Sequence, residues 1–338
     1  MSKVGIIANP YSGRDLRRLT TRASNISHNE KTRKVLRIIH ALEAYGIEKV
    51  YLMPDSYNLN SGIVRVHEAE GNSYLQIELL DYLPIDKPEE TIMAADMMVN
   101  RGIGCLIVLG GDGTNRLVAR CEMDIPVISV STGTNNVYPS MLEETTAGIA
   151  AAYLASGNSR NGFLKRSKRI EVYINDELAD VALVDASVTE VPFIGSKVVP
   201  GIDEVKDIVA CRCGPDLIGS SSVIGSVAIC EEDDDFGYHT RVGEKEINTL
   251  AAFSSGQIVE VYQSRPNRMH LGDPCAIHPD FPGTIALDGE RTLLFRKNDE
   301  LKFVITRKGP IKGNVREVLY QAVRDGFFML EPSDRRPA

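Results

Sequence analysis

The first part of the chain alternates short apolar runs with stretches of helical periodicity. The apolar runs predict strands at residues 3–8, 50–53, 77–80, 105–109 and 125–130. Apolar residues at helical spacing predict helices at 29–44, 89–101 and 143–155, and a further helix begins near Asn115. Because strands alternate with helices, we predict a doubly wound parallel α/β domain over residues 1–157.

The pattern changes after residue 157. Short β-type runs separated by Gly, Pro, Asp and Ser occur at 168–174, 180–188, 206–210, 223–229, 249–253, 257–262 and 284–287. They predict a β-rich, sandwich-like second domain over residues 158–300. Residues 301–306 have the pattern of a strand and residues 315–324 that of an amphipathic helix. We expect this last segment, 301–338, to pack back on the first domain.

Composition excludes several classes of protein. The 338 residues are 43% hydrophobic and 25% charged, which is typical of a globular protein of about two domains. No apolar run approaches the roughly 20 residues of a membrane span, and the N-terminal run is too short for a signal peptide, so we expect a cytoplasmic protein. The net charge of −8 argues against a nucleic-acid partner.

Cysteine, histidine and the longest acidic run add little chemistry by themselves. The six cysteines are scattered, and we expect them to be mostly reduced and buried. No metal site is predicted, because the histidines at 28, 40, 239, 270 and 278 lack the H-x-x-x-H and H-E-x-x-H spacings. Residues 231–235 are all acidic, and we expect a solvated loop there.

A glycine-rich turn directly follows the apolar run at 105–109. It reads Gly110-Gly-Asp-Gly-Thr114. Glycines allow positive φ and close approach of the backbone to a ligand, and N–H groups at the start of a helix bind phosphate. A carboxylate beside a phosphate site is repulsive unless it holds Mg²⁺ or takes a proton from an attacking hydroxyl, so Asp112 suggests phosphoryl transfer. The alternative is a tight turn in which Asp112 caps the helix.

Two further polar turns end other predicted strands. Asn9-Pro-Tyr-Ser-Gly13 follows the first strand, and Gly133-Thr-Asn-Asn136 follows the run at 125–130. Because the carboxyl ends of parallel strands share one edge of a sheet, we expect all three turns to converge there. In the second turn, Asn135 or Asn136 could instead cap a helix. Arg14, Arg17 and Arg18 after the first turn would face either phosphates or solvent.

The three motifs resemble those of the superfamily that includes NAD kinases and diacylglycerol- or sphingosine-type lipid kinases. The closest resemblance is to its acetoin catabolism protein X branch, on the strength of NPYSGRDLRRL and GTNNVYP. The resemblance implies an α/β domain followed by a β-sandwich, with the active site between them. It also implies ATP and Mg²⁺ as cofactors, a nucleotide-type hydroxyl acceptor such as NAD, and a homo-oligomer.

The resemblance further implies roles for single residues. Asp112 would be the base for the acceptor hydroxyl, and Asp288, in Leu287-Asp-Gly-Glu290, would take part in catalysis. The residues that would contact the nucleotide are Asn9, Ser12, Gly13, Arg14, Gly110, Gly111, Gly113, Thr114, Gly133, Thr134, Asn135 and Asn136. A lipid or small-polyol kinase and a non-catalytic nucleotide-binding protein linked to acetoin catabolism are the alternatives. The residues do not distinguish ATP from polyphosphate as the donor.

Overall fold

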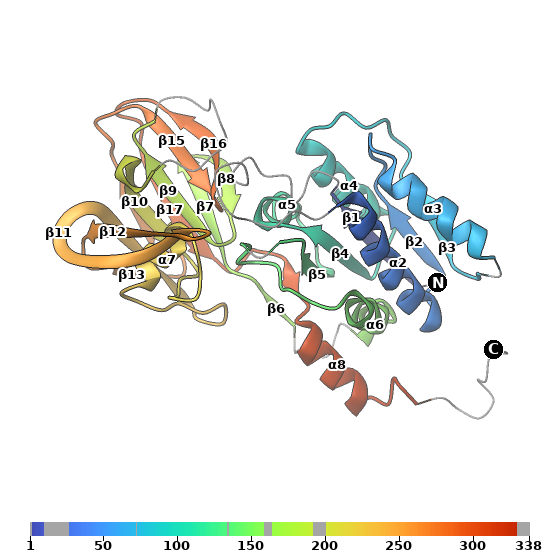
Figure 1. The fold of residues 1–338 in the computed structure, drawn as a ribbon. Helices are drawn as coiled ribbons and strands as arrows, with labels where there is room; N and C mark the ends of the chain where they lie inside the picture. Colours follow the sequence, from blue (N-terminus) through green and yellow to red (C-terminus); the bar gives the residue numbers. More distant parts are fainter. Residues whose placement is uncertain are drawn as a thin grey trace.

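The computed structural model describes residues 2–9, 27–71, 73–133, 135–158, 164–191 and 201–329. These residues form an α/β domain on a mainly parallel sheet and a β-rich domain on antiparallel sheets, which lie side by side in Figure 1. The predicted fold class is therefore confirmed. No helix in the described ranges is long and apolar enough to cross a membrane.

The first domain is built on a seven-stranded sheet. Its parallel strands are β1 (Lys3–Ala8), β2 (Lys49–Leu52), β3 (Gln76–Leu79), β4 (Cys105–Gly110) and β5 (Pro126–Ser131). Their order is β3-β2-β1-β4-β5, and β18 (Ile311–Lys312) and β6 (Lys165–Arg166) extend the sheet beyond β5. This order makes β1, β4 and β5 neighbours, which places the ends of all three next to one another.

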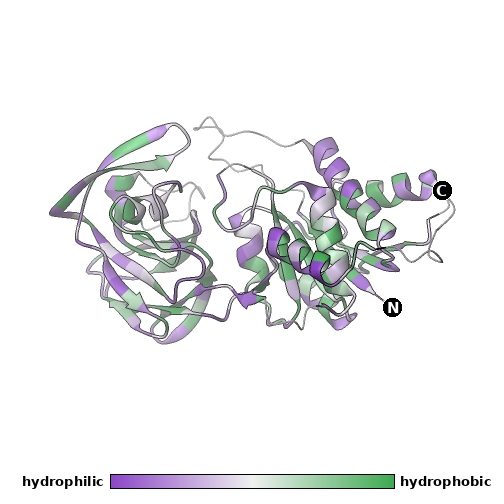
Figure 2. Ribbon diagram, turned by 90° about the horizontal axis from the view of Figure 1, so that it is seen from below, coloured by the Kyte–Doolittle hydropathy of each residue, from purple (hydrophilic) through white to green (hydrophobic). Residues whose placement is uncertain are grey.

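Helices cover both faces of this sheet. They are α2 (His28–Ala44), α3 (Leu59–Glu70), α4 (Glu89–Asn100), α5 (Asp112–Val118) and α6 (Glu144–Ala155). Alternate side chains of β4 enter two separate cores: Ile107 packs with α2, α3 and α6, whereas Val108 packs with α4 and α5. Figure 2 shows mostly hydrophobic strands between helices with hydrophilic outer segments. Apolar side chains on both faces explain the near-continuous apolar runs of the strands.

The second domain consists of two packed sheets. Its elements are β7 (Arg169–Ile174), β8 (Glu177–Ala182), β9 (Asp185–Thr189), η2 (Ile202–Glu204), β10 (Val205–Ala210), α7 (Ser220–Gly225), β11 (Phe236–Ser254), β12 (Gln257–Gln263), β13 (Asn267–His270), β14 (Pro274–Ile277), β15 (Gly283–Leu287), β16 (Glu290–Phe295) and β17 (Leu301–Thr306). One sheet has the order β12-β11-β10-β9-β15-β16, with β13 on β11, and the other has the order β14-β17-β7-β8. Phe303 from one sheet and Val188 from the other share a core, which makes this domain a sandwich.

Three details differ from the sequence predictions. Residues 223–229 were expected to form a strand, but Val223 and Ile224 are buried in the short helix α7; a short apolar run does not distinguish the two. Residues 180–188 form two strands, β8 and β9, separated by a bend. Helix α3 was not predicted.

The end of the chain is divided between the two domains. Strand β17 pairs with β14 and β7 of the second domain, so the expectation that residues 301–306 pack on the first domain is wrong. Helix α8 (Val315–Arg324) does return: Val315, Val318 and Ala322 are buried in the first domain's core, next to α6. Strand β17 remains part of the second domain because its inward-facing residues complete the core of the sandwich.

A buried ion pair joins β10 to β11 in the second domain. His239 Nε2 lies 2.8 Å from Asp207 Oδ1, and both side chains are largely buried. Burial lowers the pKa of His239, but hydrogen bonding to Asp207 and the Cys275 thiol outweighs burial and raises this pKa to about 9. Stability contributed by a raised histidine pKa is complete below the ordinary value of 6.5 and is lost as pH rises through about 9.

We predict that His239→Gln reduces the free energy of unfolding at pH 6 by up to about 3 kcal/mol, the equivalent of the pKa shift. The difference from the unsubstituted protein should shrink as pH rises from 6.5 to 10. Urea unfolding at several pH values measures it, with the exposed His270→Gln as the control. If the difference in unfolding free energy between the two proteins is the same at every pH, the ion pair between His239 and Asp207 does not cause it.

Candidate active site

The polar turns that follow β1, β4 and β5 meet at one edge of the parallel sheet. After β1, Asn9 Nδ2 donates a hydrogen bond to Thr114 Oγ1 at 3.3 Å. After β5, Asn136 accepts from the Asp112 N–H at 3.4 Å and donates to Ser131 Oγ at 2.8 Å. The expected convergence is therefore present. Asn136 braces the two turns against each other instead of capping a helix, and Asn135 is exposed beside it.

The central glycines allow close packing and do not have the expected positive φ. Gly111 has a φ of −91°, and Gly110 and Gly113 are also outside the left-handed region. A Cβ on Gly110 would lie 2.5 Å from Thr114 Cβ, and one on Gly111 would lie 2.8 Å from Asn136 Oδ1. Both contacts are shorter than real Cβ atoms make. At Gly110 a side chain would meet the Cβ of Thr114 and glycine is needed, whereas at Gly111 the end of the Asn136 side chain would have to move.

Gly113 is the point where the second domain touches the turn. A Cβ there would lie 2.9 Å from Oε1 of Glu290, the first residue of β16. The side chain of Glu290 is 33% exposed. A partly exposed carboxylate thus rests directly against the glycine turn, a contact that the sequence analysis did not single out. The Asp-Gly-Glu motif was its only sequence signal.

Asp112 connects the glycine turn with the turn after β5. Its carboxylate accepts hydrogen bonds from the backbone N–H of Val137 at 3.1 Å and of Tyr138 at 2.8 Å. Asp112 begins α5 and is half-buried. The side chain therefore has a structural task, because it fixes the backbone of residues 137 and 138.

Asp288 fixes a backbone bend in the second domain, as Asp112 does in the first. Its buried carboxylate accepts hydrogen bonds from the backbone N–H groups of Leu183, Val184 and Asp185 at 2.8–3.3 Å, which form the bend between β8 and β9. Asp288 itself has a φ of 49°. Burial, followed by the negative charge of Asp112, raises the pKa of Asp288 well above its ordinary value. The two predicted acids are therefore electrostatic neighbours across the domain interface.

A buried arginine also crosses this interface. Arg116 of α5 pairs with Asp180 of β8 at 2.7 Å, and both side chains are at least 93% buried. Its second terminal nitrogen lies 3.9 Å from Glu290. Arg116 was not predicted as a site residue, although it follows the GGDGT motif by two positions. It provides positive charge beside the acids.

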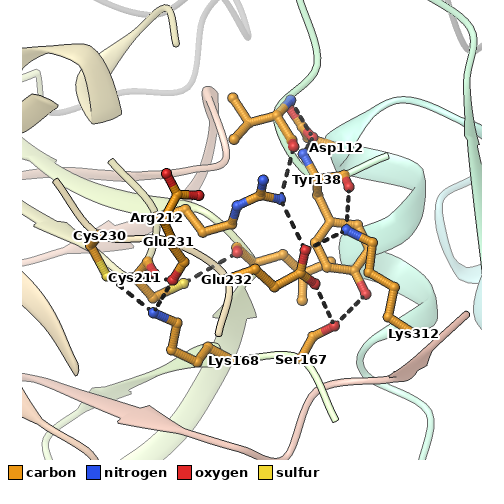
Figure 3. A network of polar contacts seen from close by, with 12 residues as sticks. Asp112, Tyr138, Ser167, Lys168, Cys211, Arg212, Cys230, Glu231, Glu232 and Lys312 are labelled. Carbon is orange, nitrogen blue, oxygen red and sulfur yellow. Dashed lines mark hydrogen bonds and ion pairs between the residues drawn. The ribbon is translucent and has the colours of Figure 1, made fainter. Parts of the chain in front are cut away.

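A second polar network holds the backbone of residues 137 and 138 from the other side (Figure 3). Arg212 donates to the Val137 carbonyl and Lys312 to the Tyr138 carbonyl, each at 2.9 Å. Lys312 also binds Glu232 at 2.9 Å. Burial lowers the pKa of Lys312, and Glu232 opposes this effect. Although several members of the acidic run 231–235 are exposed, the run is not merely solvated: Glu232 is a structural ion-pair partner.

Several predicted ligand contacts lie outside the described residues. They are Ser12, Gly13, Arg14 and Thr134, together with Arg17 and Arg18 of the arginine cluster. Gly133 is buried, and its carbonyl accepts hydrogen bonds from Asn136 and Ser131. Their roles toward a ligand stay predictions.

Comparison with known proteins assigns both parts of the chain to known families. Residues 4–158 match the ATP-NAD kinase N-terminal domain, and residues 168–308 match the acetoin catabolism protein X C-terminal domain. Over 309 residues the chain is 33% identical to acetoin catabolism protein X of Cupriavidus necator, with 88% of this chain and 86% of that protein covered. This chain belongs to the acetoin catabolism protein X family.

One solved structure of low sequence identity has a similar fold. A putative diacylglycerol kinase from Bacillus anthracis has a TM-score of 0.50 at 12% identity, with 93% of this chain and 98% of that chain covered. A diacylglycerol kinase from the same organism has a TM-score of 0.48 at 13% identity, with 93% and 97% covered. The first likeness shows a shared fold and nothing about the substrate. Together with the ATP-NAD kinase match over residues 4–158, the architecture gives this chain an NAD kinase-like fold.

We predict that Arg116→Met lowers the free energy of unfolding by about 3–5 kcal/mol, because it leaves Asp180 buried without its close partner. Arg120→Met is the matched control: Arg120 lies 3.7 Å from the same carboxylate but is 43% exposed, so its loss should cost at most about 1 kcal/mol. Denaturant unfolding measures both. Equal losses for the two variants would show that burial does not set the strength of this pair.

Proposed function

We propose that this protein transfers a phosphoryl group from ATP to a hydroxyl of a nucleotide-type acceptor, NAD or a related compound. One observation carries the proposal: a glycine turn at the end of a parallel strand meets carboxylates from both domains. Phosphoryl transfer depends on positioning and on neutralising charge, and this site brings acids from both domains together beside a buried arginine. Membership of a family with an NAD kinase-like fold supports the same activity. We also propose that the protein acts in the cytoplasm as a homo-oligomer.

Asp112 is the residue to which we assign the base. It is half-buried at the first position of α5, whereas Asp288 is buried and bonded to three backbone N–H groups. A base has to reach the acceptor hydroxyl, and the accessible carboxylate is better suited to that. We assign Asp288 a positioning role. It fixes the bend between β8 and β9 through hydrogen bonds, and its carboxyl group contributes to the electrostatic environment of Asp112.

The carboxylates also fit the cation that ATP brings. Mg²⁺ binds protein through one or two carboxylates together with phosphate oxygens and water. Glu290 is partly exposed, rests on Gly113 and is the accessible acid that the second domain contributes. We assign Glu290 to Mg²⁺ binding, where the cation would neutralise phosphate charge beside Asp112.

The charge of the interface favours a polar acceptor over a lipid. The charged side chains around the glycine turn and the turn at residues 137–138 are Asp112, Arg116, Asp288, Glu290, Arg212 and Lys312, and they lie beside a small apolar cluster that contains Tyr138, Val181 and Leu183. A lipid acceptor would need an apolar surface for its chains. The polar acceptors therefore come first in the test.

A product assay tests the proposal. Purified protein is incubated with Mg²⁺ and either ATP or polyphosphate, and with NAD, nucleosides, small polyols or diacylglycerol, and products are identified by mass spectrometry. We expect a phosphorylated nucleotide-type product. Phosphorylation of a lipid or polyol would show that the acceptor is not a nucleotide. Nucleotide binding without any product would show that the protein is a nucleotide-binding protein and not a kinase.

Asp112→Asn should lower kcat by about 10²-fold or more, the usual scale for loss of a general base. Because the amide also meets the N–H groups of residues 137 and 138, thermal unfolding and calorimetric nucleotide affinity must be measured on the same variant. Glu122→Gln, an exposed acid in the loop after α5, is the control and should keep full activity. A folded Asp112→Asn protein with unchanged kcat would move the base elsewhere.

A further inference from the structure

Helices α2 and α3 bring three metal-ligating side chains together away from the domain interface. His40 comes from α2, and His67 and Glu70 come from α3. One ligand atom of each lies within 4.8 Å of the others. His67 and Glu70 are three positions apart, which places them on the same side of one helix, and His40 faces them from the neighbouring helix.

His67 lacks the hydrogen bonds that a buried imidazole normally has. It is 5% exposed, and neither ring nitrogen has a partner among the described residues. Its position continues the buried side of α3 after Leu59 and Ile63, where an apolar residue would avoid the penalty. A buried polar group without a partner costs about 1–3 kcal/mol, so such a group in a native protein requires an explanation such as an ion.

The other two side chains can move toward a shared ion. His40 is 51% and Glu70 48% exposed, and His40 Nε2 lies 2.9 Å from Glu70 Oε2. A tetrahedral zinc ion with bonds of about 2.0–2.1 Å needs its ligand atoms roughly 3.3 Å apart. The separation between His40 and Glu70 is slightly shorter than that value, and the separations from His67 are at most 4.8 Å, so rotamer adjustments of the two exposed side chains can bring the three ligand atoms around one ion.

We propose that His40, His67 and Glu70 bind a Zn²⁺ ion that links α2 to α3. Two imidazoles and one carboxylate are a zinc donor set, and with three protein ligands water takes the fourth position. The buried His67 is the fixed ligand, and the ion supplies the partner that its ring lacks. The exposed residues close the site from the surface.

The position of this site gives it a structural task that is separate from phosphoryl transfer. Helices α2 and α3 run back from the carboxyl edge of the parallel sheet, and the three ligands lie in their later turns. The ion therefore lies toward the opposite edge from Asp112. It fastens the outer pair of helices, whose packed side chains form part of the first domain's core.

Zinc titration of tag-free, chelator-treated full-length protein tests the proposal. We expect calorimetry to give one Zn²⁺ per chain and a rise in Tm on adding ZnCl₂, because a ligand that binds only the folded state stabilises it. His40→Gln and Glu70→Gln change exposed side chains, should fold normally, and should each lose the zinc-dependent rise in Tm. His278→Gln, an exposed histidine of the second domain, should keep it.

The His67→Leu variant distinguishes two explanations for the buried histidine: that it is a metal ligand, or that the fold tolerates it without a function. It removes the unpaired ring and should raise Tm without zinc while abolishing the response to zinc. The proposal is overturned if the unsubstituted protein binds no Zn²⁺, or if His40→Gln and Glu70→Gln bind it as the unsubstituted protein does. The second result would place the ion on other residues, such as the cysteines.

Discussion

The close packing around residues 110–114 is the constraint on which the site depends. Three separate groups press against this turn at positions where a Cβ would stand: Thr114 against Gly110, Asn136 against Gly111 and Glu290 against Gly113. One contact comes from the turn itself, one from the turn after β5 and one from the second domain. Glycine is required most strictly at position 110, where the neighbour is the Thr114 Cβ, because the atoms that approach Gly111 and Gly113 are the ends of side chains that can shift.

Two aspartates extend that constraint through the backbone. Each accepts hydrogen bonds from consecutive N–H groups of a bend: Asp112 from residues 137 and 138, and Asp288 from residues 183 to 185. Polar backbone groups that are buried at bends need such partners. The negative charge of Asp112 raises the pKa of Asp288. The same carboxylates that fix the two bends therefore also set the charge of the site.

The sequence was most informative where local pattern decides the structure. Strand β4 and helix α2 follow from periodicity, and the convergence of the turns follows from the parallel sheet they imply. It was least informative where tertiary contacts decide. The apolar run at Val223 folds as a helix because it is buried among β10 and β11, and Arg116 acquires its importance from an aspartate 64 positions away. The close approach of the Asn136 side chain to Gly111 is likewise a tertiary contact that no local pattern reveals.

The turn at residues 137–138 explains why the site needs both domains. Its N–H groups are held by Asp112 of the first domain, and its carbonyls by Arg212 of the second and by Lys312 of the returning segment. Lys312 and Arg212 both pair with Glu232, at 2.9 and 3.7 Å. A backbone segment fixed on both sides by charged groups keeps its position only while all three parts of the chain are docked. The chain's return to the first domain through β18 and α8 is thus part of how the site is built, because it anchors Lys312 beside the β5 strand.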